Sequence, residues 1–189
     1  MTKAIVTLRE EHMNMTKMLD AFERQLLVFD AAGSPDYDII QGSVDYCLDY
    51  LDLYHHPRED LVFRKLQSRN PAAGTAIGNL EAEHKKLAEL ARRVKTMVQH
   101  VVGDVEVSRQ SFDRLARKFL MSYQRHIKTE ERLYFPAVVA NLRSQDWAEI
   151  DNQLTTPDDP VFGRSTEKRF EALHRNIVAW DRPNRAAGR

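Results

Sequence analysis

The pattern H-x-x-x-E occurs twice in the sequence, at His55–Glu59 and at His126–Glu130. Residues four apart lie one above the other on an α-helix, so each copy can point an imidazole and a carboxylate at the same spot. A single histidine, His12, lies 43 residues before the first copy, and His84 lies 42 residues before the second. The chain therefore reads as two copies of one helical hairpin, which predicts a four-helix bundle.

Apolar residues spaced by three and four predict long helices over residues 2–30, 36–69, 72–102 and 106–143. Short segments rich in Gly, Pro, Asn and Asp separate them, and strand-like alternation is almost absent. The expected fold class is therefore all-α, an up-down-up-down four-helix bundle. The four histidines and two glutamates all fall on the apolar stripes that face the bundle interior.

These polar side chains are also expected at one level of the bundle. With short loops and a helical rise of about 1.5 Å per residue, all of them lie roughly 15–26 Å from the same end. Two glutamates buried on stripes without lysine or arginine need a positive partner, and metal ions supply one. The predicted metal ligands are His12, His55, Glu59, His84, His126 and Glu130.

The donor types limit the choice of metal. Imidazole and carboxylate without thiolate suit iron, manganese or zinc. Six donors are too many for a single tetrahedral zinc, so the set predicts two ions, each with two histidines and with both carboxylates bridging. Each ion then keeps open positions, which accommodate an oxo or hydroxo bridge and a small ligand such as dioxygen, nitric oxide or peroxide.

Over roughly residues 3–143, the chain resembles the hemerythrin-like, or HHE cation-binding, family. The motifs that carry this resemblance are His12, the HHPRED stretch at residues 55–60, His84, and His126-x-x-x-Glu130 followed by LYFP at residues 133–136. The resemblance implies a non-haem di-iron site in a four-helix bundle. It also assigns ligand roles to the six residues named above.

The sequence departs from the oxygen-carrying hemerythrins at one position. Those proteins use a fifth histidine from an H-x-x-x-H element on the third helix, whereas Leu80 and Ala88 lie one turn from His84 here. The resemblance therefore favours gas or redox sensing, iron handling or repair of iron centres over reversible oxygen carriage. An oxidase or a peroxide-consuming enzyme with the same ligands, and iron storage or delivery, remain open as alternatives.

His55 and His56 are adjacent, and helical geometry distinguishes them. His55 and Glu59 continue the inner stripe, whereas His56 and Asp60 lie about 100° around the helix from them. Pro57 removes one backbone hydrogen bond and bends the helix axis. His55 is therefore the expected ligand, and His56 would supply a fifth imidazole only if the helix is kinked or overwound at Pro57.

A ferritin-like di-iron fold is a distinct alternative. It requires E-x-x-H elements on two helices. Glu81–His84 fits this pattern, but Tyr123 occupies the corresponding position before His126. The sequence therefore favours the hemerythrin-like arrangement.

Composition excludes several other classes of protein. Lys+Arg and Asp+Glu both number 28, so no net charge favours nucleic acid or an anionic membrane. No apolar run approaches 20 residues, and a single cysteine, Cys47, excludes an internal disulfide framework. We expect a cytoplasmic protein whose partner is a small diatomic ligand or peroxide.

The chain is expected to divide into a bundle over residues 1–143 and an extension over residues 144–189. In the extension, a turn-rich linker at residues 156–160 precedes a helix over residues 165–180. That helix is expected to pack across the bundle or to form a homodimer interface.

Overall fold

The computed structural model describes residues 2–153 and 157–181. Within these residues the regular secondary structure is entirely helical. The α-helices are α1 (Lys3–Asp30), α2 (Tyr37–Tyr46), α3 (His56–Arg69), α4 (Pro71–Ile77), α5 (Leu80–Val102), α6 (Arg109–Thr129), α7 (Phe135–Asn141), α8 (Ser144–Asp151) and α9 (Glu171–Asp181). Two π-helices, η1 (Cys47–His55) and η2 (Glu130–Tyr134), and a 3₁₀-helix, η3 (Lys168–Phe170), complete the described elements.

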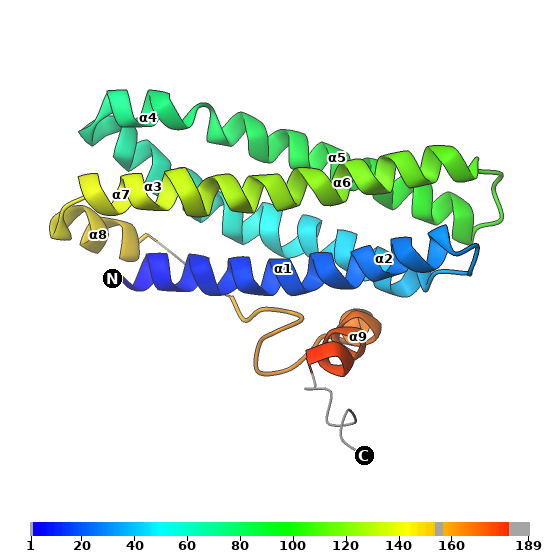
Figure 1. The fold of residues 1–189 in the computed structure, drawn as a ribbon. Helices are drawn as coiled ribbons and strands as arrows, with labels where there is room; N and C mark the ends of the chain where they lie inside the picture. Colours follow the sequence, from blue (N-terminus) through cyan, green and yellow to red (C-terminus); the bar gives the residue numbers. More distant parts are fainter. Residues whose placement is uncertain (1, 154–156, 182–189) are drawn as a thin grey trace, which may run out of the picture.

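Four long rods lie side by side in the bundle (Figure 1). They are α1, then α2 continuing through η1 into α3, then α5, and finally α6 continuing through η2 into α7. Each rod packs against the next in chain order, and α6 packs back against α1. The predicted all-α bundle with an additional C-terminal helix is therefore confirmed.

The third predicted helix, over residues 72–102, is interrupted. Gly78 adopts a φ of 98°, a left-handed conformation that glycine tolerates best, and it separates α4 from α5. The Asn79 side chain then caps α5 by accepting a hydrogen bond from the backbone N–H of Ala82 at 3.0 Å. The prediction of one continuous helix here was wrong.

Each of the two π-helices ends two residues before a proline. η1 precedes Pro57 and η2 precedes Pro136, so the wide turns accommodate residues that lack a backbone N–H. An extra residue in a turn shifts the helical register by about 100°. Leu133, which α-helical spacing placed inside the bundle, is consequently 55% exposed, and Tyr134 is buried instead.

The apolar core is divided into two clusters along the bundle axis. One cluster fills the half that contains Phe22, Phe119 and Tyr46, and the other fills the half that contains Ile5 and Trp147. On each rod, the predicted site residues lie between the part that joins one cluster and the part that joins the other. The site is therefore a buried polar layer between two apolar layers.

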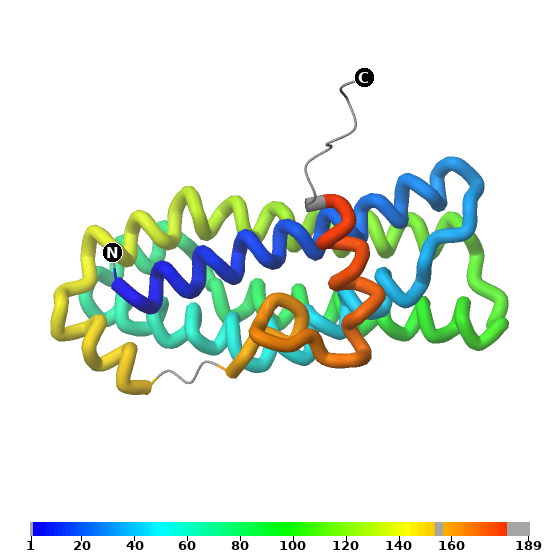
Figure 2. Tube along the Cα trace, turned by 90° about the horizontal axis from the view of Figure 1, so that it is seen from below, coloured from blue at the N-terminus to red at the C-terminus, as the bar shows by residue number. Residues whose placement is uncertain are grey.

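The described part of the extension packs on the bundle. α8 contacts α1 and α3, and its buried Asp146 forms an ion pair with Arg69 at 2.6 Å. α9 runs across α1 and α2 (Figure 2) and approaches closely at Gly42, where an added Cβ would lie 3.3 Å from Leu173. Residues 154–156 and 182–189 lie outside the described residues, so the start of the predicted linker is not placed. None of the described helices has the length and apolar character that a membrane crossing requires.

Candidate metal centre

All six predicted ligands converge inside the bundle, and each is at most 3% exposed. His12 on α1 points its Nε2 atom at two carboxylates, at 3.3 Å from Glu59 Oε1 and 3.3 Å from Glu130 Oε2. His55, at the end of η1, places its Nε2 atom 3.3 Å from Glu59 Oε2. Two helices thus direct imidazoles at one side of the carboxylate pair.

The other two imidazoles approach the same carboxylates from α5 and α6. His84 Nε2 lies 3.5 Å from Glu59 Oε2 and 3.6 Å from Glu130 Oε1. His126 Nε2 lies 3.2 Å from Glu130 Oε2. The two glutamates therefore stand between imidazoles from all four rods, as the doubled sequence pattern predicted.

His56 also faces the bundle interior, which the helical-wheel argument did not anticipate. Its ring is 1% exposed and stacks on His84, with ring centroids 4.1 Å apart and ring planes inclined by 8°. His126 lies edge-on to it at 5.6 Å. The expectation that His56 lies outside the inner stripe was wrong, because η1 shifts the register just before this residue.

The donor atoms fall into overlapping groups. Within each group, one atom from each residue lies within 4.8 Å of the others. The groups are His12 with His55 and Glu59, His56 with His84 and His126, and Glu59 with His84, His126 and Glu130. The arrangement therefore has two ends, one with His12 and His55 and the other with His56, His84 and His126. The carboxylates of Glu59 and Glu130 lie between these two ends.

The Nδ1 atoms of three imidazoles face carboxylates on the far side of the ring from the centre. These contacts are His55 with Glu11 at 2.8 Å, His84 with Asp60 at 2.8 Å and His12 with Glu131 at 3.0 Å. His126 Nδ1 lies 3.7 Å from Glu83. An N–H donated from Nδ1 leaves the Nε2 lone pair directed at the centre, which is the tautomer a metal ligand requires.

These outer carboxylates repeat with the hairpins, and the sequence analysis missed them. Glu11 and Glu83 each directly precede a single histidine. Their carboxylates face the Nδ1 atom of the H-x-x-x-E histidine on the next rod, Glu11 facing His55 and Glu83 facing His126. The acid that follows each H-x-x-x-E glutamate faces the Nδ1 atom of a single histidine, as Asp60 faces His84. The available signal was an acid directly before each single histidine and directly after each H-x-x-x-E glutamate.

The Glu11 carboxylate is itself held firmly. Its Oε1 atom accepts hydrogen bonds from the Tyr50 hydroxyl at 2.9 Å and from Arg58 Nη2 at 2.6 Å. Arg58 is 4% exposed and also donates from Nε to the Tyr54 carbonyl at 2.8 Å. A buried cation therefore neutralises this outer acid and fixes the orientation of His55 through it.

Inside this shell, the polar atoms that face the centre lack hydrogen-bond partners among the described residues. They are the Nε2 atoms of His12, His55, His56, His84 and His126, together with both carboxylate oxygens of Glu59 and of Glu130. Buried polar atoms are nearly always paired, so a cluster of lone pairs aimed at one volume marks a site for cations. The donor set fits metals that accept nitrogen and oxygen ligands.

A family model described as "Hemerythrin HHE cation binding domain" matches residues 3–138 of the chain. The chain belongs to this hemerythrin HHE family. The resemblance noted from the motifs is thereby confirmed, and membership implies that the domain binds metal cations. An uncharacterized protein of Haemophilus influenzae is 29% identical over 125 residues, which cover 60% of this chain and 68% of that protein. No solved structure matches the chain.

The carboxylates of this hemerythrin HHE domain control the charge on its imidazoles. Burial by itself lowers the pKa of His12, but the neighbouring carboxylates of Glu130, Glu131 and Glu59 raise it to about 11. Burial likewise lowers the pKa of His84, and its carboxylate contacts raise it to about 10. Without metal, the imidazoles of His12 and His84 are therefore protonated on both nitrogens and positively charged at neutral pH.

Loading of this hemerythrin HHE domain with metal is therefore expected to release protons. Cations displace the protons on His12 and His84, because only neutral imidazole binds metal, so on the order of two protons per chain should leave at pH 7. Calorimetric titration in two buffers with different ionisation enthalpies measures this number. A binding enthalpy that is the same in both buffers would contradict the assigned protonation.

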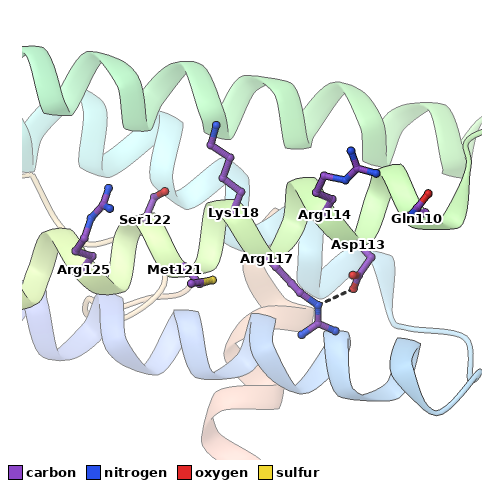
Figure 3. Close-up of a pocket in the computed structure, with 8 residues that line it drawn as sticks. All are labelled: Gln110, Asp113, Arg114, Arg117, Lys118, Met121, Ser122 and Arg125. Atoms are coloured by element: carbon purple, nitrogen blue, oxygen red, sulfur yellow. Dashed lines mark hydrogen bonds and ion pairs between the residues drawn. The ribbon is translucent and has the colours of Figure 1, made fainter.

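The centre is separate from the surface hollow drawn in Figure 3. That hollow, of about 700 Å³, lies on the outer side of α6 and is lined mainly by polar and basic side chains, including Arg114, Lys118 and Arg125. Arg117 there pairs with Asp113 at 2.8 Å. No residue of the buried centre lines this hollow, so its positive charge does not contact the buried glutamates.

Proposed function

We propose that this chain is a non-haem di-iron protein that binds or senses a small ligand, namely dioxygen, nitric oxide or a redox state. The observation that carries the proposal is the cluster of unpartnered Nε2 and carboxylate atoms at the centre of the bundle. Family membership supports cation binding, and the donor types support iron, with manganese or zinc as the other fits.

Seven residues form the proposed ligand set, one more than the sequence indicated. His12 and His55 serve one ion, and His56, His84 and His126 serve the other. Glu59 and Glu130 lie between the two groups and contact imidazoles of both, which supports bridging roles. His56 supplies the fifth imidazole that α5 lacks.

The two ends of this set are unequal, and the inequality supports binding of a small ligand at the end with fewer protein donors. Counting both bridging carboxylates, the ion beside His56 has more protein donors than the ion beside His12. If each ion took about six donors, more positions would be left for a small ligand at the His12 and His55 end. Phe135 stacks on His12 there, with ring centroids 5.0 Å apart, and gives this end an apolar wall.

Resident ions fit this chain better than metal held as cargo for delivery. The Nδ1 atoms of three imidazoles are fixed by hydrogen-bonded carboxylates, and the Tyr134 hydroxyl donates to the Glu59 carbonyl at 2.7 Å. Bound iron would supply a redox-active Lewis acid, while the chain orients the donors and keeps bulk water out.

Metal analysis combined with optical spectra tests the proposal. Iron-loaded protein should contain about two ions per chain. Its visible spectrum should differ between nitrogen, air and nitric oxide. An iron content well below one per chain after reconstitution, or a spectrum that no gas alters, would contradict the proposal. Catalytic consumption of added hydrogen peroxide would instead favour a peroxide-consuming di-metal enzyme.

A further inference from the structure

Two buried tyrosines stack beside the proposed centre. Tyr46, the last residue of α2, and Tyr50 in η1 have ring centroids 5.4 Å apart and ring planes inclined by 19°. The Tyr50 hydroxyl donates to Glu11, whose other oxygen accepts from His55 Nδ1 at 2.8 Å. A short path of aromatic rings and hydrogen bonds therefore joins Tyr46 to a proposed metal ligand.

The Tyr46 hydroxyl has its own carboxylate partner, which the C-terminal extension supplies. It donates to Asp159 Oδ2 at 2.8 Å, while Asp159 Oδ1 accepts from the backbone N–H groups of Val161 and Phe162. Burial raises the pKa of Asp159 although these hydrogen bonds lower it. Asp159 is therefore a carboxylate that can take a proton from the phenol.

The partner of Tyr50 is a poorer proton acceptor. The guanidinium of Arg58 lies 2.6 Å from Glu11 Oε1, so this carboxylate is already paired with a buried cation. Glu11 already accepts three hydrogen bonds, from His55, Arg58 and Tyr50. Of the two stacked phenols, Tyr46 is thus the one that can lose its proton together with an electron.

The surroundings of Tyr46 protect a radical from water. The ring is fully buried, and Phe162 and Phe170 lie edge-on to it at 6.0 Å and 6.4 Å. All three aromatic residues belong to the larger core cluster or pack against it. Reactive molecules from solvent therefore have no direct contact with this ring.

We propose that Tyr46 is a one-electron donor to the metal centre, with Tyr50 as the bridging ring and Asp159 as the proton acceptor. The proposal rests on the di-iron function proposed above. It gives the C-terminal extension a chemical role, because the segment before α9 supplies the carboxylate.

Hydrogen peroxide is the oxidant for this step. It takes up two electrons and two solvent protons, its O–O bond breaks, and it leaves as two water molecules. A reduced metal ion held by these ligands would supply the first electron and would be oxidised by one unit. Tyr46 gives the second electron through Tyr50, and its phenolic proton moves to Asp159 along the hydrogen bond between them.

Electron paramagnetic resonance of the iron-loaded protein after peroxide addition tests this step. Wild-type protein should show a tyrosyl radical, and Tyr46→Phe should lose it. Tyr37→Phe is the matched control, because Tyr37 begins the same helix, is partly buried and contacts Phe112 instead of a carboxylate. An unchanged radical signal in Tyr46→Phe would overturn the proposal.

Asp159→Asn tests the proton acceptor while keeping the phenol. Asparagine retains an oxygen for the two backbone N–H groups, so the local turn is preserved, but it cannot take the proton. This variant should lose most of the radical signal. Retention of the full signal would exclude Asp159 as the acceptor and overturn that part of the proposal.

A metal-free measurement separates this inference from the di-iron proposal. A ruthenium photo-oxidant can reach Tyr54, which is 37% exposed and lies 5.9 Å from Tyr50. Flash oxidation of metal-free protein should leave the radical on Tyr46, and Tyr46→Phe should move or abolish it. If iron analysis fails but this radical forms, the relay stands without the di-iron function. If iron is bound but neither method gives a Tyr46 radical, the relay alone is wrong.

Discussion

Replacing His84 by alanine is expected to reduce the iron content from about two ions per chain to one or fewer, and to remove most of the visible absorption of an iron pair. The reason is geometric: His84 Nε2 faces both buried glutamates, at 3.5 Å from Glu59 and 3.6 Å from Glu130. Its loss removes one donor from the end that also holds His56 and His126. Elemental analysis and optical spectra measure both effects.

The matched control is His100→Ala, because His100 lies on the same helix but is exposed near its end. It should leave metal content and spectrum unchanged, so equal effects in the two variants would reject the ligand set. His56→Ala distinguishes six donors from seven. It should behave like His84→Ala if His56 is a ligand, whereas normal iron content would return the set to the six residues that the sequence indicated.

Replacing Glu59 by glutamine is expected to lower the melting temperature of the metal-loaded protein by about 10 °C. Bound metal at a thousand times its dissociation constant contributes about 4 kcal/mol of stability, which is worth roughly 2–4 °C per kcal/mol in a chain of this size. Glu59 is completely buried and contacts imidazoles from α1, η1 and α5. Its replacement removes a donor that the two proposed ions would share.

Without metal, the same substitution should change the melting temperature little. In the metal-free protein, the carboxylates of Glu59 and Glu130 repel each other. Once glutamine replaces Glu59, a neighbouring imidazole can lose a proton, so no uncompensated charge stays buried. Glu10→Gln, on an exposed position of α1, serves as the control in both states. Equal destabilisation with and without metal would show that Glu59 acts only in folding.

The sequence predicted the bundle well because its evidence was periodic. Apolar stripes set the four rods, and the doubled H-x-x-x-E pattern brought His55, Glu59, His126 and Glu130 to one layer. Apolar burial and helical spacing determine both features, and neither depends on the exact rotation of one helix against another. The domain boundaries and the homodimer interface remain predictions.

The errors arose where the helix departs from α-helical pitch. His56 was placed about 100° away from the inner stripe of its helix and Leu133 on the stripe of its own helix, and both placements assumed about 100° per residue throughout. Pro57 predicted a bend in its helix, but only the structure shows that Pro57 and Pro136 each follow a π-helix that changes the register. The break at Gly78 was missed because the residues around it continue an apolar stripe.

The outer carboxylates illustrate a different limit. Glu11 and Asp60 are adjacent in sequence to predicted ligands but serve imidazoles on other rods. Which acid orients which ring depends on the relative rotation of two helices, and a single sequence does not encode that rotation in any simple spacing. Their positions, directly before each single histidine and directly after each H-x-x-x-E glutamate, are nevertheless a usable signal in a doubled chain.

The extra residue within η1 has a consequence for how such chains can change length during evolution. A deletion in the turn at residues 31–36 would alter a surface connection and leave the interior in phase. A deletion between residues 47 and 55 would restore ordinary pitch and rotate everything after it, turning one of the paired imidazoles toward solvent. A one-residue deletion can therefore change the number of metal donors in a chain that keeps the same H-x-x-x-E motif. The motif sequence and the number of ligands need not evolve together.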